Sequence, residues 1–369
     1  MALRKKNKAR SAPAAPAAPA AAAAPDGGTP PAGATLRDIA ERTGLALSTV
    51  SMALRRHPRI SKATHKRVLA AARKAGYCAN PLVTALMAQV RRHRRLQPSG
   101  EVLGFLTSSA SEDKWREYPS LVDHWEGARR RALEQGFQME TFWLGTGGAD
   151  SARINRILRA RRIRAVIIAP VMANHKPFRL DWDNLAVVAL QYSFRQVAVH
   201  RVAHHQTNGM YLCYRKLREH GYRKIGLALN CFDDERTHHY WRAGWLAARE
   251  VYGGEPVDLL CVREEFPSLG EVRDWLEQTK PDAVISPAGM WLSAIRKNGY
   301  AVPERIAYAS LDVMPAQVGH IAGIWQDNRR IGANAVDILS GQLFRNETGL
   351  SSTPVATLID GAWLDGPTV

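Results

Sequence analysis

Short apolar strands alternate with helix-sized segments through most of the chain after Gly100. The pattern predicts strands at 102–107, 139–144, 165–169, 186–190, 224–229, 258–262, 283–286 and 306–311, and helices at 122–135, 208–220, 240–252 and 269–279. Because a strand, a helix and a second strand in succession form a parallel unit with the helix on one face of the sheet, this region predicts an α/β fold. At about 270 residues it exceeds the usual size of one domain, so we expect two doubly wound parallel-sheet subdomains.

A different pattern occupies residues 35–79, ahead of this region. Leu36, Ile39 and Ala40 have the spacing of one buried helical stripe, and Gly44 ends that helix in a tight turn. A second helix follows directly, and a third is predicted at 62–75 with Ser61 as its cap. Three short helices with a tight turn between the first two are typical of a helix-turn-helix unit, although other small helical bundles share this pattern.

Positive charge is concentrated at this end of the chain. The net charge is +17, and residues 1–100 hold 19 Lys and Arg against 3 Asp and Glu, whereas the remaining residues hold 32 against 31. Basic side chains throughout the helical unit suit phosphate contacts: Arg37, Arg42, Arg55, Arg56, Arg59, Lys62, Lys66, Arg67, Arg73 and Lys74. The charge distribution therefore indicates DNA as the partner of this unit.

The same residues resemble the headpiece of the LacI/GalR family of bacterial transcription regulators. The matching positions are Thr35, Leu36, Asp38, Ile39, Ala40, Gly44, Ser48, Thr49, Val50, Ser51, Leu54, Ile60, Ser61, Thr64, Val68, Gly76, Tyr77 and Asn80. The match has no gap, and it covers the turn, the recognition helix, the third helix and the start of the hinge together.

The resemblance implies which residues contact DNA. They are Thr35, Leu47, Ser48, Thr49, Ser51, Met52, Arg55, Arg56, Tyr77, Asn80 and Leu86. Leu47 and Ser48 occupy the two variable base-reading positions, where a leucine suits a thymine methyl group and a serine can donate or accept. Met52 stands where the family often has Arg or His, so a bidentate guanine contact is not expected there. Ala46 replaces the usual capping serine.

Residues 80–97 carry a further short amphipathic pattern. Leu82, Leu86 and Val90 recur every four residues, which predicts a helix too short to be stable without a partner. In the family this helix is the hinge, which pairs with its copy in a dimer, and Leu86 matches the leucine that enters the minor groove. Four arginines follow, and they suit either replacement phosphate contacts or a solvated linker: Arg91, Arg92, Arg94 and Arg95.

The long region resembles the family's periplasmic-binding-protein-like core. Residues 221–226, 302–306 and 332–336, together with Asp312 and Gln326, match the family pattern. Ligands of such sheets collect at the carboxyl ends of strands. We therefore expect effector contacts from Ser108, Trp115, Trp241, Pro287, Asp312, Trp325 and Gln326.

The polar clamps of sugar-responsive relatives are incomplete in this chain. Pro287 and Ala288 replace an Asn-Asp pair, and Trp241 replaces an arginine, while Asp312 and Gln326 remain. Either the effector is unusual or the cleft binds none. The tryptophans suit a ligand cleft and equally the packing of a core.

The predicted organisation has four parts. Residues 1–34 form a disordered Ala/Pro-rich basic tail, 35–79 the DNA-binding domain, 80–100 the hinge helix and linker, and 101–369 the core for effector binding and dimerisation. Within the core we expect one subdomain of 101–220 with 327–350, and a second of 221–326 with 351–369.

These observations predict a transcription regulator, most simply a repressor, that binds a pseudo-palindromic double-stranded DNA operator as a homodimer. Its effector would be a sugar or related metabolite, and neither a metal nor another cofactor is expected. The alternatives are a constitutive DNA binder whose core only dimerises, and an α/β enzyme with an appended DNA-binding module. No nucleophile with its base, P-loop or metal-ligand set can be assembled, so we expect no enzyme. Isolated cysteines and no apolar run of membrane-spanning length predict a cytoplasmic location and no membrane partner.

Overall fold

The computed structural model describes residues 36–54, 60–75, 101–171, 177–264, 266–287 and 289–369. The predicted tail at 1–34 and the hinge and linker at 80–100 lie outside these residues. The same holds for six of the predicted DNA contacts: Thr35, Arg55, Arg56, Tyr77, Asn80 and Leu86.

The headpiece, residues 36–75 as described, consists of three helices. They are α1 (Leu36–Thr43), α2 (Leu47–Leu54) and α3 (Lys62–Lys74). Gly44 between α1 and α2 has a φ of 63°, a backbone conformation that glycine adopts without strain. The interior is small, and its buried residues in the described part of the chain are Ile39, Val50, Ala53, Val68 and Ala72. The helix-turn-helix prediction is confirmed.

The first sheet of the core is built from six parallel strands. In spatial order they are β11 (Ala356–Ile359), β5 (His200–His204), β4 (Ala186–Leu190), β3 (Ala165–Ile168), β1 (Val102–Thr107) and β2 (Gln138–Trp143). Alternate strand residues point to opposite faces. Phe105 and Ile167 therefore join the core under α5 (Pro119–Glu134) and α12 (Asn328–Arg345), whereas Leu106 and Ile168 join the core under α6 (Ser151–Ala160). The predicted doubly wound arrangement is confirmed here.

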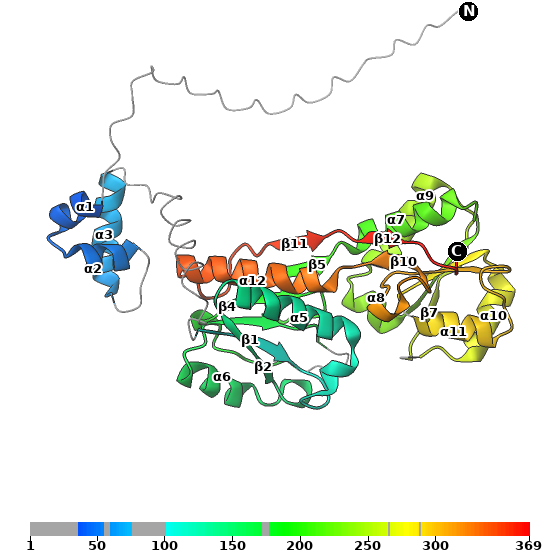
Figure 1. The fold of residues 1–369 in the computed structure, drawn as a ribbon, viewed down its shortest axis with the longest axis horizontal. Coiled ribbons are helices and arrows are strands. Elements are labelled where there is room, and N and C mark those ends of the chain that lie inside the picture. Colours follow the sequence, from blue (N-terminus) through cyan, green and yellow to red (C-terminus); the bar gives the residue numbers. More distant parts are fainter. Residues whose placement is uncertain (1–35, 55–59, 76–100, 172–176, 265, 288) are drawn as a thin grey trace, which may run out of the picture.

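The second sheet repeats this strand order. It runs β12 (Ala362–Leu364), β10 (Ala322–Trp325), β9 (Ala307–Ser310), β8 (Ala283–Ser286), β6 (Ile225–Asn230) and β7 (Leu260–Val262), with only β12 antiparallel to its neighbour. Its helices are α7 (Gln206–Glu219), α8 (Cys231–Arg236), α9 (Tyr240–Tyr252), α10 (Leu269–Thr279) and α11 (Gly289–Lys297). The two sheets lie end to end in the core (Figure 1).

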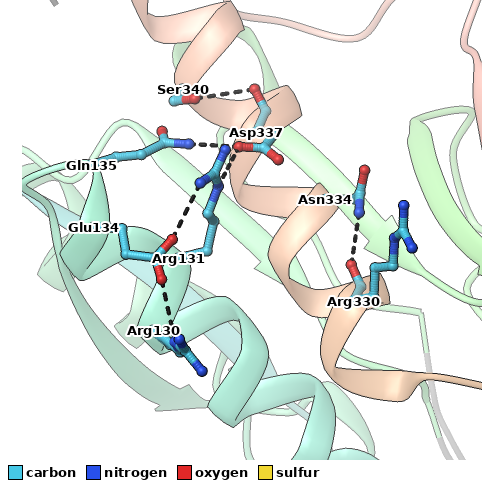
Figure 2. Close-up of polar contacts among 8 residues, drawn as sticks. All are labelled: Arg130, Arg131, Glu134, Gln135, Arg330, Asn334, Asp337 and Ser340. Atoms are coloured by element: carbon cyan, nitrogen blue, oxygen red, sulfur yellow. Dashed lines mark hydrogen bonds and ion pairs between the residues drawn. The ribbon is translucent and has the colours of Figure 1, made fainter. Parts of the chain in front are cut away.

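Two glycines allow α5 and α12 to pack closely. A Cβ atom at Gly127 would lie 1.9 Å from the carbonyl oxygen of Arg329, and one at Gly332 would lie 2.0 Å from that of His124. Figure 2 shows the polar contacts farther along this pair, where Arg131 of α5 and Gln135, the residue after its end, both reach Asp337 of α12. The Arg131 Nε to Asp337 Oδ1 distance is 2.7 Å. Helix α12, which follows strand β10 of the second sheet in the chain, is thus fixed to α5 of the first subdomain.

Two parts of the predicted subdomain division are wrong. Residues 351–369 were all assigned to the second subdomain, but β11 pairs in parallel with β5 of the first sheet, and only β12 joins the second. Helix α7 was assigned to the first subdomain, yet Met210, Cys213 and Leu217 pack in the core of the second. Strand pairing and helix packing are long-range choices, which the local pattern of apolar residues does not encode.

In the described ranges, no helix has the length and apolar character needed to span a membrane.

Candidate functional site

The first turn of α2 presents the two predicted base-reading residues to solvent. Leu47 is 51 % exposed and Ser48 is also exposed, whereas Val50 and Ala53 on the opposite side of the helix are fully buried. The exposed leucine side chain is in contact with water in the isolated headpiece. Its burial against a partner would therefore be favourable. Thr49, Ser51 and Met52, also predicted to contact DNA, are partly exposed.

Hydrogen bonds from α3 fix the position of α2. The His65 ring nitrogen Nδ1 lies 2.9 Å from the carbonyl oxygen of Ala53 at the end of α2, and Arg67 donates to the carbonyl oxygen of Thr43 at 2.6 Å. Helix α3 begins where predicted, because the Ser61 hydroxyl accepts from the Thr64 backbone N–H at 3.2 Å. Helix α3 therefore holds the end of α2 through Ala53, and the end of α1 before the turn through Thr43.

A second candidate site lies where strands of the two sheets end. Ser108 follows β1 and is buried, and its hydroxyl has no hydrogen-bond partner among the described residues. On α5, His124 is 1 % exposed and its Nδ1 is also without a partner. Buried polar atoms are usually satisfied, so orphaned ones at the carboxyl edge of a sheet are evidence for a missing ligand. We call this region the cleft.

Predicted effector residues from the second sheet meet α12 at the cleft. Asp312 follows β9, and the Asn328 side chain at the start of α12 donates to its Oδ1 at 3.4 Å. Gln326 follows β10 and donates to the carbonyl oxygen of Leu311 at 2.8 Å. The Oδ1 atom of buried Asn328 has no hydrogen-bond partner among the described residues.

Burial sets the charge of the two titratable groups in the cleft. Burial raises the pKa of Asp312 to about 7, against the opposing effects of Arg236 and Asn328. Burial lowers the pKa of His124 to about 3, the positive charge of Arg236 acts in the same direction, and the neighbouring Asn328 side chain opposes both. His124 is therefore neutral at pH 7, and Asp312 is close to its titration midpoint.

The positive charge of Arg236 lowers the pKa of a group on each subdomain, His124 on α5 and Asp312 after β9. It occupies the end of α8, where its Nε lies 2.5 Å from Asp233 Oδ1. Asn230, the last residue of β6, caps α8 by accepting from the Asp233 backbone N–H at 2.7 Å. The sequence predicted ligand contacts at the carboxyl ends of strands but did not identify this short helix or Arg236.

Aromatic side chains connect the two subdomains beside α8. The Tyr192 ring, after β4, meets the Tyr240 ring edge-on with centroids 5.0 Å apart, and His238 stacks on Tyr240. Gln191 and His238 have φ values of 56°, unusual for residues with a side chain. Such conformations cluster at ligand clamps and switch regions, where the surrounding packing holds them.

Two of the predicted effector-binding tryptophans are packed inside the molecule. Trp115 is 1 % exposed and packs edge-on against Trp125, and Trp241 is 2 % exposed within the second core. Neither offers appreciable surface to a ligand in this conformation. Trp325 is partly exposed at the end of β10, and Pro287 is buried after β8. The side chains that sequence reasoning missed are His124, Asn328, Gln191 and Arg236.

No group of three or more His, Cys, Asp or Glu residues in the described part of the chain is placed to hold a metal ion. The sequence also gave no sign that two of its separated cysteines would meet. Cys231 begins α8, and its Sγ lies 2.8 Å from Sγ of Cys261 on β7.

Known families match both parts of the chain. The model described as "Bacterial regulatory proteins, lacI family" matches residues 35–80, and the periplasmic binding protein-like domain matches residues 214–362. The HTH-type transcriptional repressor PurR of Aliivibrio salmonicida is 22 % identical over 322 residues, which cover 83 % of this chain and 91 % of that protein. Its counterpart in Aliivibrio fischeri is 22 % identical over 324 residues, covering 83 % and 90 %.

Solved structures share the fold. The complex of the transcriptional regulator CelR with cellobiose has a TM-score of 0.57 at 18 % identity, covering 91 % of this chain and 100 % of that one. The lac repressor dimer bound to operator and the anti-inducer ONPF has a TM-score of 0.56 at 19 % identity, covering 91 % and 98 %.

Proposed function

The chain belongs to the lacI family of bacterial regulatory proteins, and from this we propose that it is a sequence-specific DNA-binding transcriptional repressor. It binds a pseudo-palindromic operator as a homodimer and responds to a small-molecule effector. The observation that carries this proposal is the outward face of α2, where Leu47 and Ser48 are exposed on a helix whose other side is buried.

In the proposed mechanism, α2 lies in the major groove of the operator. Leu47 contacts a thymine methyl group and Ser48 hydrogen-bonds a base edge, while exposed basic residues of the headpiece contact phosphates. Arg37, Arg42, Lys62 and Lys66 are exposed and suited to that role. The contacts predicted outside the described residues, including Leu86 in the hinge, belong to the same proposal.

The proposed effector occupies the cleft. The unpaired atoms Ser108 Oγ, His124 Nδ1 and Asn328 Oδ1 support a ligand with several hydrogen-bonding groups. A sugar or related metabolite has this character, and CelR is described in complex with cellobiose. The effector controls DNA binding if it binds the two arrangements of the subdomains with different affinity.

The family consists of regulators, and we infer that this chain acts without catalysis, in the cytoplasm. We also propose that residues 35–79 and 101–369 act as separate domains joined by residues 80–100. The competing function is constitutive DNA binding. Pro287 and Trp241 favour it, because both are buried apolar residues where sugar-responsive relatives have polar clamps.

The test of DNA binding is a selection of genomic DNA fragments by the purified full-length protein at two salt concentrations. We expect enrichment of one pseudo-palindrome, and a changed or weakened preference for Leu47→Ala. The matched control is Leu246→Ala on α9, which removes a similarly exposed leucine from the core. Equal binding of all fragments with a steep salt dependence would refute operator specificity.

The test of effector control is thermal unfolding in the presence of sugars and related metabolites. An effector at 100 times its dissociation constant should stabilise the protein by about 2.7 kcal/mol. Ser108→Ala should reduce this stabilisation, whereas Ser293→Ala, an exposed position on α11, should not. A constitutive binder would instead recognise the operator, but none of the metabolites tested would stabilise it.

A further inference from the structure

Arginines gather on one side of the first subdomain, away from the cleft. Helix α6 and the segment that joins it to β3 contain Arg153, Arg156, Arg159, Arg161, Arg162 and Arg164. Residues 101–369 as a whole hold 32 basic against 31 acidic side chains, so this excess is local. A local excess of this kind needs a physical explanation, since like charges in one place repel each other.

Carboxylates neutralise only half of these arginines. Arg161 Nη1 lies 2.6 Å from Glu140, Arg159 lies 2.8 Å from Asp181, and Arg153 lies 3.8 Å from Asp150. Arg156, Arg162 and Arg164 form no side-chain hydrogen bond or ion pair with other described residues. Their guanidinium groups are available for an external anion.

Two of the unpaired arginines border a cavity of about 390 Å³. Leu158, Ile163 and Leu185 contribute its apolar lining, while Arg162, Arg164 and Asn184 contribute polar groups. Arg159 and Asp181 also border it and pair with each other. We call Arg162, Arg164 and the rim of this cavity the arginine surface.

Strand register places the arginine surface at the edge where the chain arrives from the headpiece. Gly104 of β1 pairs with Val166 of β3, so Arg164 lies opposite Val102, the first residue of β1. Because the strands are parallel, this is the amino edge of the sheet, and the cleft lies at the opposite, carboxyl edge. The surface therefore lies at the edge of the sheet where β1, the first strand after the headpiece in the chain, begins.

We propose that the arginine surface binds phosphates of the DNA held by the headpiece, as a second, sequence-independent contact made by the core. This inference rests on the proposed function. Arginine suits the task because its planar guanidinium forms two parallel hydrogen bonds to a phosphate. The contact adds affinity without changing which bases are read, since phosphates carry no direct sequence information.

The test compares full-length variants on the selected operator duplex and on an unrelated duplex of equal length. The double variant Arg162→Ala/Arg164→Ala removes the two arginines, and Arg162→Lys/Arg164→Lys keeps their charge. Arg296→Ala/Lys297→Ala is the control, since it removes the same charge from an exposed part of α11 in the second subdomain. Affinity is measured at several salt concentrations, after thermal unfolding has shown that each variant is folded.

We expect the Arg162→Ala/Arg164→Ala variant to lose affinity for both duplexes by the same factor, about tenfold. The slope of log affinity against log salt should become shallower by about 2, one for each lost phosphate contact. The lysine variant should retain most of the affinity, and the control should match the wild type.

Wild-type affinity and slope in the Arg162→Ala/Arg164→Ala variant would overturn the proposal. An equal loss in the α11 control would also overturn it, because net charge alone would then explain the effect. If inorganic phosphate stabilises the wild type but not the alanine variant while DNA binding is unchanged, the surface binds small anions instead of DNA. Failure of the proposed function is recognised separately, because the wild type itself would then select no operator.

Discussion

The headpiece and the core place their polar groups in opposite ways. In the described residues, the headpiece interior has five buried apolar side chains, and its polar α2 residue Ser48 faces solvent. The core instead buries polar atoms of Ser108, His124 and Asn328 without partners at the carboxyl edge. An outer surface suits a partner much larger than the unit itself, whereas buried unpaired groups suit a ligand small enough to be enclosed.

This difference also predicts unequal tolerance to mutation. In the headpiece one residue is a large share of the interior, whereas the core contains three larger clusters of buried residues. Small domains are only marginally stable, since they bury a smaller fraction of their surface. The following changes test whether the two regions are independent in stability.

The largest effect is expected for Ile39→Ala in the headpiece. Removal of a fully buried isoleucine should cost about 2–5 kcal/mol, comparable with the whole stability of such a small unit. DNA binding should be lost, and calorimetry should show the unfolding transition of the core unchanged. A core transition that falls together with DNA binding would mean that the two regions unfold as one.

The converse change is Gly332→Ala in α12. Its Cβ would lie 2.0 Å from the His124 carbonyl oxygen, so α5 and α12 must move apart, at a cost of about 1–3 kcal/mol. Calorimetry should show a lower transition temperature of the core and no change in the headpiece. The control is Gly270→Ala in α10, where the added Cβ meets nothing within 4 Å and no destabilisation is expected. Equal effects of both changes would contradict the close packing of α5 and α12.

Asp312→Asn should alter the pH dependence of core stability. The pKa of Asp312 rises on folding from 3.8 to about 7, mainly because of burial. Between those values the folded chain binds more protons, so this group lowers the free energy of unfolding as pH rises, by at most about 1.4 kcal/mol per pH unit. His124 acts oppositely between pH about 3 and 6.5, because its pKa is lowered on folding.

The informative quantity is therefore the stability of Asp312→Asn minus that of the wild type, measured by denaturant unfolding at several pH values. We expect this difference to increase from pH 4 to pH 7, since the His124 contribution is common to both proteins. A difference independent of pH would show that Asp312 is as well solvated in the folded chain as in the unfolded one.

The smallest effect is expected for Ser61→Ala at the start of α3. It removes the hydrogen bond to the Thr64 backbone N–H and should cost the headpiece about 1 kcal/mol. Operator affinity should fall only near the headpiece melting temperature, as measured by binding at increasing temperature. A loss of affinity at low temperature would instead give Ser61 a direct role in contacting DNA.

Elements with a strong local pattern were predicted well. Strands β1, β4 and β8 and helices α9 and α10 have the predicted bounds, because their apolar periodicity and terminal residues are properties of short segments. Strands β5, β10, β11 and β12 were not predicted. In β11 only Ile359 is buried, so this strand has little of the apolar pattern on which a prediction depends.

Part of the cleft was predictable for the same reason. Asp312 follows a predicted strand, and strand ends can be found from local sequence, whereas Gln326 follows β10, which was not predicted, and was named through the family resemblance. Arg236 and Asn328 lie on helices that arrive from distant parts of the chain, so their place beside Asp312 could not be derived from spacing. Local sequence did not decide where Trp115 and Trp241 lie. Both are near predicted loops, but the structure packs them inside the molecule.

The sequence by itself determined the basic helix-turn-helix unit and the two-sheet α/β core, because these follow from local periodicity and from charge. Only the tertiary structure decided which sheet β11 and α7 join, which buried polar atoms remain unpaired, and which arginines lack a carboxylate. Each of those outcomes depends on contacts between residues far apart in the chain, and the balance of burial, pairing and charge exists only after the chain has folded.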